Sequence, residues 1–240
     1  MNSLPRNAKL LLLAVVLVAL AFSAHAFLSS SQVWSSGAGN LRFLILLLLS
    51  VAAARMKVRL PGLESNLSMN LPFILVAAFE LPSSQALVIG SIATFAQCLF
   101  ESKQQFNSAK MTFNVCNVLS AVSLASLTAG RALHFQSIAT TSLFIATAAA
   151  VFFLADTIPV AGIIAATGNG RTWKLWREIT GLTLPYFVLS AGTAMIVIGV
   201  GYYKGLTLLV ALLLMYFVWS SFKRYFDHAS ARLQAFAARA

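Results

Sequence analysis

The sequence predicts an all-α fold, a polytopic integral membrane helical bundle of about seven to eight transmembrane helices. Of the 240 residues, 59% are hydrophobic and only 10% are charged, whereas a soluble domain carries about 25% charged residues. The apolar residues gather in runs, and the basic residues lie between those runs. No soluble fold could bury so much apolar surface, so we expect the chain to lie in a lipid bilayer.

The first apolar run, Leu10–Phe22, follows two basic residues and precedes the small-residue sequence Ala24-His25-Ala26. This order is typical of a secretory signal peptide. The alternative is an uncleaved transmembrane anchor over residues 1–28. We favour the anchor because a second apolar run follows closely. Cleavage of a signal would instead place the new N-terminus in the periplasm.

Residues 29–222 form the predicted multi-span domain. Its apolar runs cover residues 41–54, 70–81, 84–100, 111–129, 135–155, 158–167, 182–200 and 206–222. A helix needs about 20 residues to cross the hydrocarbon, and the runs 41–54, 70–81 and 158–167 are shorter. We expect the first two to extend into their polar flanks or to cross a thinner bilayer, and the third not to cross.

Lysine and arginine predict the orientation, because they accumulate in cytoplasmic loops. With a cytoplasmic N-terminus and eight crossings, all but three of the 17 basic residues lie inside. The exceptions are Arg42, Arg131 and Lys204. This bias predicts a protein of the bacterial cytoplasmic (inner) membrane with both termini in the cytoplasm. Residues 223–240 form a basic, amphipathic cytoplasmic tail.

Two apolar segments contain a carboxylate followed by a proline. Pro82 follows Glu80 and separates two apolar runs, so we expect the outer turn of a helical hairpin there. Pro159 follows Asp156, and an unbroken helix through this segment would be about 50 Å long, far longer than the bilayer core. We therefore expect a break at Asp156–Pro159, with residues 158–167 re-entrant or along the inner interface. The shared order of features is also compatible with an internal repeat, and paired interruptions of this kind indicate binding sites in transporters.

The stretch RTWKLWRE, residues 171–178, combines aromatic and basic residues. Tryptophan rings favour the headgroup region, where cations also meet anionic lipid. We expect a helix along the cytoplasmic interface here. Its interface residues are Arg171, Trp173, Lys174, Trp176 and Arg177.

Ionisable side chains inside a membrane are costly and indicate function by default. Two acids are set in strongly apolar sequence, and residues 111–126 carry amides and hydroxyls at three-residue spacing. These amides and hydroxyls could supply neutral ligands to a polar molecule or cation held by an acid. The structural alternative is that the acids snorkel to water and the polar ridge joins helices. The candidate ligand-binding residues are Glu80, Asn114, Asn117, Ser120 and Asp156.

Several classes of function have no support in the sequence. The signatures of serine hydrolases, zinc peptidases and P-loop ATPases are absent, so we expect no enzymatic activity. Cys98, Cys116 and the three separated histidines form no metal-ligand pattern, and we expect neither a metal nor a cofactor. The net charge of +11 does not predict nucleic-acid binding, because the basic residues lie between apolar runs rather than along one face.

Five motifs follow one another between residues 59 and 179: RLPG, SMNLPFIL, LPSSQALVIGSIATF, FNVCNVLS and RTWKLWREI, with a carboxylate-x-x-Pro sequence between the last two. This order resembles the N-terminal multi-span membrane region that precedes HD-GYP or GGDEF output domains in bacterial cyclic-di-nucleotide signalling proteins. The resemblance covers residues 40–225, roughly, and implies a region that senses a stimulus and passes it to a cytoplasmic enzyme. Residues 223–240 carry neither output sequence, so we expect a stand-alone domain.

Three functions remain open at this point. The first is a membrane sensory or small-ligand-binding domain that signals to a separate cytoplasmic partner through the C-terminal tail. The second is a small transporter, or the substrate-binding subunit of one, which the interrupted segments favour. The third is a structural membrane protein whose polar residues join helices. In each case the lipid bilayer covers the apolar surface.

Overall fold

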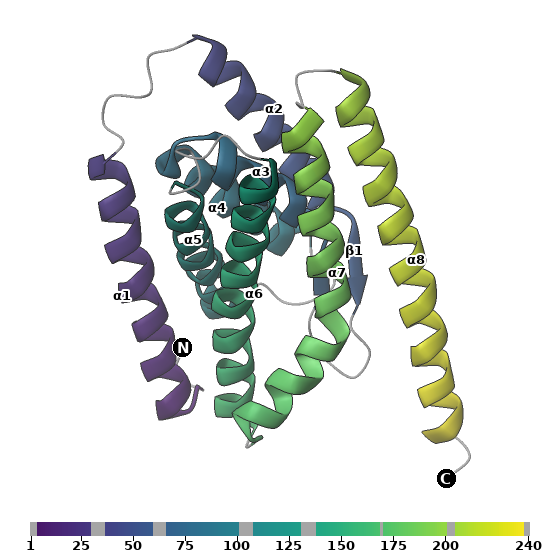
Figure 1. Ribbon diagram of the computed structural model, residues 1–240. Coiled ribbons are helices and arrows are strands. Elements are labelled where there is room, and N and C mark those ends of the chain that lie inside the picture. The colour runs from purple at the N-terminus through teal and green to yellow at the C-terminus, as the bar shows by residue number, and fades with distance from the viewer. Residues whose placement is uncertain are drawn as a thin grey trace.

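The computed structural model describes residues 4–29, 37–59, 66–100, 108–130, 138–168, 170–200 and 205–237. Within these ranges the helices are α1 (Arg6–Ser29), α2 (Gly37–Ala53), α3 (Leu71–Glu80), α4 (Ser83–Leu99), α5 (Ser108–Gly130), α6 (Ile138–Gly168), α7 (Thr172–Val200) and α8 (Gly205–Ala237). Figure 1 shows most of them running side by side, with α1 and α8 at opposite edges. The fold is therefore helical, as the sequence predicts.

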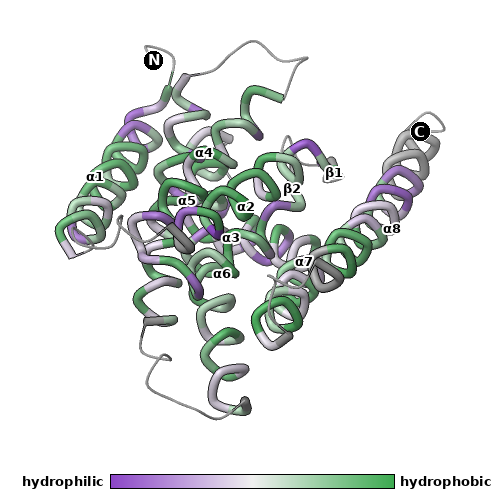
Figure 2. Tube along the Cα trace, turned by 90° about the horizontal axis from the view of Figure 1, so that it is seen from above, coloured by the Kyte–Doolittle hydropathy of each residue, from purple (hydrophilic) through white to green (hydrophobic). Residues whose placement is uncertain are grey.

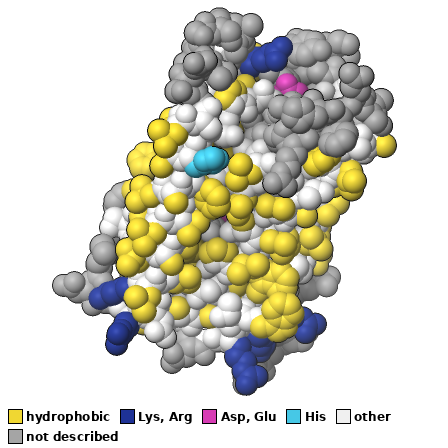
Figure 3. Space-filling model, turned by 60° about the vertical axis from the view of Figure 1, so that its left-hand side comes forward, with side chains coloured by type: hydrophobic (Ala, Val, Ile, Leu, Met, Phe, Trp, Pro, Cys, Tyr) yellow, Lys and Arg dark blue, Asp and Glu magenta, His cyan; other side chains and the backbone are white. Residues whose placement is uncertain are grey.

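In the described part of the chain, five helices are long and apolar enough to cross a membrane: α1, α5, α6, α7 and α8. Much of the helical trace is made of hydrophobic residues (Figure 2), and on the face shown in Figure 3 a broad apolar belt lies above the basic side chains at the lower end. Large side chains in these helices are exposed, such as Leu20 at 61% and Phe217 at 69%. Contact with lipid explains this exposure, because contact with water would leave a very large unfavourable apolar surface.

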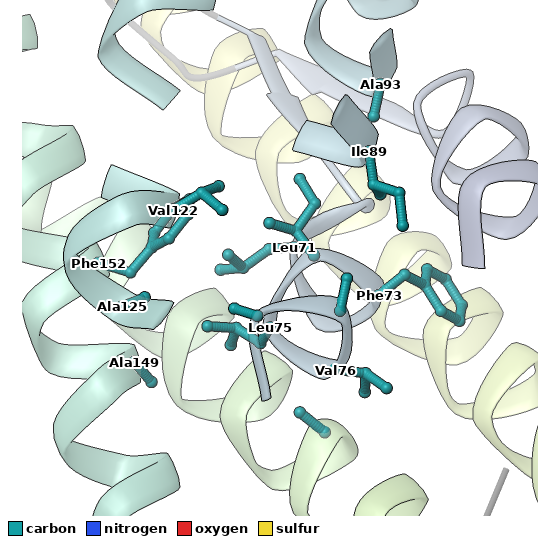
Figure 4. Close-up of a cluster of buried hydrophobic side chains, with 14 of the residues drawn as sticks. Leu71, Phe73, Leu75, Val76, Ile89, Ala93, Val122, Ala125, Ala149 and Phe152 are labelled. Carbon is teal, nitrogen blue, oxygen red and sulfur yellow. The ribbon is translucent and has the colours of Figure 1, made fainter. Parts of the chain in front are cut away.

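The short helix α3 lies in the interior of the bundle, where it contacts α2, α4, α5, α6 and α7. Its first eight residues, Leu71 to Ala78, are all buried. In Figure 4, Leu75 points toward Ala125 and Ala149, whereas Phe73 and Val76 point to the other side of the helix. A helix that is apolar all round is typical of a buried position, so α3 needs no lipid-facing surface.

The helices α3 and α4 meet at Pro82. Leu81 and Pro82 have extended backbone, with ψ of 157° and 143°, and α4 begins at the next residue. The first N–H groups of a helix have no partner within it, so proline, which lacks an N–H, removes no helical hydrogen bond at this N-terminus. Its ring also fixes φ at a value that suits the start of a helix. These bounds lie within a residue or so of the expected runs, 70–81 and 84–100.

The expected break at Asp156–Pro159 is absent, and that prediction was wrong. A single helix, α6, includes Pro159 and the whole of residues 158–167. Its 31 residues give a length of about 46 Å, so its end extends beyond a hydrocarbon core of about 30 Å. Proline removes one helical hydrogen bond, and a membrane helix tolerates this loss where neighbouring helices supply polar groups. The hydrogen bond that Pro159 cannot make is the one to the carbonyl of Ala155, four residues earlier, and α6 stays continuous where it packs against α5 and α7.

Two further segments belong to longer helices than the sequence predicted. The stretch RTWKLWRE does not form a separate interface helix, because Thr172 begins α7, which continues through Pro185 to Val200. Figure 1 shows α7 bending, so that its first part slants across the lower end of the bundle. Residues 223–237 of the predicted tail continue α8 without a break.

A small antiparallel sheet between α2 and α3 was not predicted. Its strands, β1 (Lys57–Arg59) and β2 (Asn66–Ser68), pair with Lys57 opposite Ser68. The strand β1 also contacts α8. The predicted positions of Lys103, Arg131, Lys204 and Arg239, and most of the RLPG motif, lie outside the described residues.

Candidate functional site

Asn117 on α5 and Asp156 on α6 form a polar contact inside the apolar bundle. The side-chain amide nitrogen of Asn117, Nδ2, donates to the backbone carbonyl of Asp156 and to its carboxylate Oδ1, both at 2.9 Å. The two helices lie against each other along their length. The amide therefore holds the carboxylate in a fixed position relative to the α6 backbone.

The hydrogen-bonding capacity of Asn117 is not fully used. Its two amide hydrogens match the two bonds to Asp156. Its carbonyl oxygen, Oδ1, is buried and has no hydrogen-bond partner, and the whole residue is only 2% exposed. A buried acceptor without a donor costs free energy, so this oxygen distinguishes the contact from a fully satisfied structural pair.

The residue after Asp156 connects the site to α7. The hydroxyl of Thr157 accepts a hydrogen bond from the indole nitrogen of Trp176 at 3.1 Å and donates to the carbonyl of Phe153. The ring of Trp173 stacks on that of Trp176, with centroids 4.8 Å apart. Trp173 is 66% exposed, as expected for a ring at the membrane interface. Trp176 in addition ties α7 to α6 beside Asp156.

Tyr186 on α7 connects the same region to β2 and α3. Its hydroxyl donates to the carbonyl of Ser68 at 2.6 Å and accepts from the backbone N–H of Leu71 at 3.2 Å. The side chain is 1% exposed, and its ring contacts Phe187, which also meets Phe153 on α6. Ser190, one turn further along α7, is also buried, beside the Tyr186 hydroxyl.

Glu80 does not join Asp156 in one pocket. It ends α3, where the charge of Arg42 on α2 acts on it. The N-terminal residue of α3, Leu71, contacts Tyr186 near Asp156 instead, and the two ends of α3 are about 13 Å apart along its axis. A cation on the neighbouring helix α2 suits a carboxylate at a helix C-terminus.

Two other candidate residues also point elsewhere. The amide of Asn114 donates to the sulfur of Cys98 on α4 at 3.8 Å, and the hydroxyl of Ser120 donates to the carbonyl of Cys116 in its own helix at 3.0 Å. Residues three apart lie within about 60° of each other on a helix and about 4.5 Å apart along its axis, and the amides of Asn114 and Asn117 reach different neighbours, Cys98 on α4 and Asp156 on α6. Of the five predicted ligand-binding residues, the structure brings together Asn117 and Asp156.

The basic residues of the predicted interface lie on the exposed surface. Arg171, Lys174 and Arg177 are all exposed at the start of α7. Figure 1 places the start of α7 at the same end of the molecule as the start of α1 and the C-terminal part of α8. On the face shown in Figure 3, basic side chains gather mainly below the apolar belt. A concentration of cations at one end is typical of the cytoplasmic side of a membrane protein.

Sequence reasoning missed Thr157 and Tyr186. The available signal for Tyr186 was a single phenol within an apolar run, because a buried tyrosine hydroxyl usually finds a partner. In the described residues, no group of three or more His, Cys, Asp or Glu side chains could hold a metal ion. Comparison of the chain with protein-family models, curated protein sequences and solved structures gave no match.

Proposed function

We propose that this chain is a membrane sensory domain of bacterial signalling type, which binds a small ligand at Asn117 and Asp156. It passes the signal through the C-terminal part of α8 to a separate cytoplasmic partner. The observation that carries the proposal is a series of ring contacts, hydrogen bonds and strand pairs that runs from α6 beside Asp156 to α8. Such a series is the physical connection that a sensor needs between its ligand and its output.

The series begins on α6 with Phe153, three residues before Asp156, whose ring meets that of Phe187 on α7 with centroids 4.7 Å apart. Phe187 in turn meets Tyr186 at 5.8 Å, and the Tyr186 hydroxyl donates to the carbonyl of Ser68 in β2. Ser68 is paired with Lys57 across the two-stranded sheet. The carbonyl of Lys57 accepts a hydrogen bond from the indole nitrogen of Trp219 on α8, at 3.1 Å. A shift of Tyr186 would therefore reach α8 through two short strands.

The proposed topology has eight crossings with both ends in the cytoplasm of a bacterial inner membrane. It is supported by the start of α1 and the C-terminal part of α8, which lie toward the same end of the bundle (Figure 1), and by the basic side chains that gather at that end of the face in Figure 3. The helices α2, α3 and α4 are shorter than the five long spans. In this proposal they cross with the help of their polar flanks or a thinner bilayer.

The proposed role also draws on the resemblance to the membrane regions that precede HD-GYP or GGDEF domains. In this proposal the chain is not an enzyme. Residues 223–240 contain a basic helical extension of the last span. A helix that leaves the membrane without a break can transmit a rotation or translation of its membrane part to a partner.

Hydrogen–deuterium exchange of the full chain in lipid nanodiscs tests the connection. Asp156→Asn removes the charge at the site, and we expect it to raise exchange in residues 57–68 and 215–225. Glu80→Gln is the matched control, because it removes one carboxylate at the far end of α3, beside Arg42. Changes in Asp156→Asn that stay within α5 and α6 would contradict the proposed series of contacts.

The output is tested by purification of the protein from its native membranes. We expect a cytoplasmic protein to copurify with the full chain and to be lost when residues 223–240 are deleted. Its binding should change in Asp156→Asn and stay unchanged in Glu80→Gln. A partner that binds all of these variants equally would show that α8 does not report on the site.

A small transporter, or the substrate-binding subunit of one, is the second candidate. Its support is the short buried helix α3, which meets α4 at Pro82 within the bundle. Reconstituted vesicles separate the two functions: solute accumulation that depends on Asp156 indicates transport, and saturable binding without flux indicates sensing. If the role is purely structural, Asp156→Asn and Glu80→Gln should both leave solute accumulation, ligand binding and partner binding unchanged.

A further inference from the structure

We propose that the ligand of the Asn117–Asp156 site is a monovalent cation of the ammonium type, either ammonium itself or a protonated primary amine. This inference rests on the proposed ligand-binding function and names the chemistry of its ligand. It is drawn from the unused hydrogen-bonding groups at the site and from the charge of Asp156.

The site lacks a hydrogen-bond donor for its buried acceptor, the Asn117 Oδ1. Both amide hydrogens of Asn117 are directed to Asp156, which leaves the Asn117 Oδ1 as a buried acceptor without a partner. The Asp156 carboxylate has a second oxygen and further lone pairs beyond the bond from Asn117. The site therefore offers acceptors to a ligand and needs donors from it. An ammonium group supplies three or four N–H donors and accepts none.

The negative charge of Asp156 also favours a cation as the ligand. No Lys or Arg of the described ranges forms an ion pair with Asp156, whose carboxylate is held by the neutral amide of Asn117. Asp156 is partly buried against α5, and a charge in a membrane-spanning helix is costly unless an opposite charge is bound. One carboxylate matches one positive charge. The bound cation would neutralise the site without a basic side chain.

Divalent ions do not fit the site. Calcium requires about six to eight oxygen ligands and magnesium about six, usually with more than one carboxylate among them. In the described residues no cluster of three metal-binding acids, cysteines or histidines exists. The pair of Asn117 and Asp156 fits a ligand that is recognised by a few directed hydrogen bonds and one charge.

The test is the thermal unfolding of the full chain in nanodiscs of zwitterionic lipid, at constant ionic strength. We expect methylammonium chloride to raise the unfolding midpoint in a saturable way, because a ligand that binds the folded state stabilises it. Sodium chloride and magnesium chloride should not do so. In Asp156→Asn and Asn117→Leu the apparent affinity should fall by about tenfold or more, whereas Glu80→Gln should retain the wild-type response.

A direct binding measurement covers the case in which a variant does not fold. Radiolabelled methylammonium should bind the wild-type protein saturably and be displaced by excess ammonium but not by sodium. Equal effects of methylammonium and sodium, or an unchanged affinity in Asp156→Asn, would overturn the inference. If no cation binds but Asp156→Asn still alters exchange in β1, β2 and α8, the ligand class is wrong and the sensory function stands. If Asp156→Asn is silent in both experiments, both proposals fail.

Discussion

Trp219 on α8 donates its indole N–H to the backbone carbonyl of Lys57 in β1, across 3.1 Å. The two residues are 162 positions apart in the chain. Lys57 also extends its ammonium group to the carbonyl of Gln97 near the end of α4. Lys223, one turn after Trp219, lies over the indole ring with its nitrogen 5.1 Å from the centroid. The strand β1 thus joins the last helix of the bundle to α4.

Trp219→Phe should loosen the link between α8 and β1. Phenylalanine keeps an aromatic ring but cannot donate to the Lys57 carbonyl, so we expect the unfolding free energy to fall by about 1 kcal/mol. Hydrogen exchange should increase in residues 57–59 and 66–68. Trp173→Phe is the control, because Trp173 is 66% exposed. If the two variants exchange alike at β1 and β2, the Trp219 bond does not hold the sheet.

Tyr186→Phe should destabilise the protein more strongly. The substitution leaves the carbonyl of Ser68 and the N–H of Leu71 without the hydroxyl that bonds both. Loss of partners for buried polar groups costs about 1–3 kcal/mol. The measurement is the thermal unfolding midpoint in nanodiscs, with Tyr225→Phe as the control, because Tyr225 is 68% exposed. Equal midpoints for the two variants would mean that the Tyr186 hydroxyl does not stabilise the start of α3.

Pro159→Ala should leave the folded structure intact and slightly raise its stability. Alanine at this position restores the N–H that the carbonyl four residues earlier lacks, within a helix that is already continuous. We expect a gain of about 1 kcal/mol or less. Pro82→Ala should instead lower the unfolding midpoint, because the extended backbone at Pro82, with φ of −53°, suits proline. A larger loss for Pro159→Ala than for Pro82→Ala would indicate that α6 requires a break.

Sequence reasoning located most helices because their apolar runs are long and their ends carry clear signals. The hairpin at Pro82 is an example, since a proline between two apolar runs can start the second helix without damage to the first. The same reasoning failed at Pro159, because the loss of one hydrogen bond, at the carbonyl of Ala155, does not end a helix that packs against α5 and α7. That packing is a tertiary effect, which the local sequence does not show.

The candidate site was predictable only in part for a similar reason. Apolar sequence around Asp156 indicated a functional acid, and the polar ridge of α5 indicated its partners. Which member of the ridge reaches Asp156 depends on the rotation of α5, and the structure selects Asn117 over Asn114. Tyr186 contacts residues more than 100 positions away in the chain. A local sequence pattern does not predict such a contact.

Gly90 on α4 should be essential for the close approach of α4 to α5. A Cβ atom added there would lie 3.0 Å from the Cγ2 of Val122, and small residues at such crossings let membrane helices pack closely. We expect Gly90→Val to lower the unfolding free energy by about 1–3 kcal/mol, because overpacking forces the helices apart. Gly181→Val is the control, because a Cβ at Gly181 meets nothing within 4 Å.

The double variant Gly90→Val/Val122→Ala separates this contact from a general effect of valine in a helix. Removal of the Val122 methyl groups makes room for the new side chain, so the double variant should recover part of the lost stability. The coupling energy between the two positions should be about 0.5–3 kcal/mol, and it should be close to zero for Gly181→Val combined with Val122→Ala. Equal losses for the two glycine variants, without coupling to Val122, would mean that α4 and α5 do not meet at Gly90.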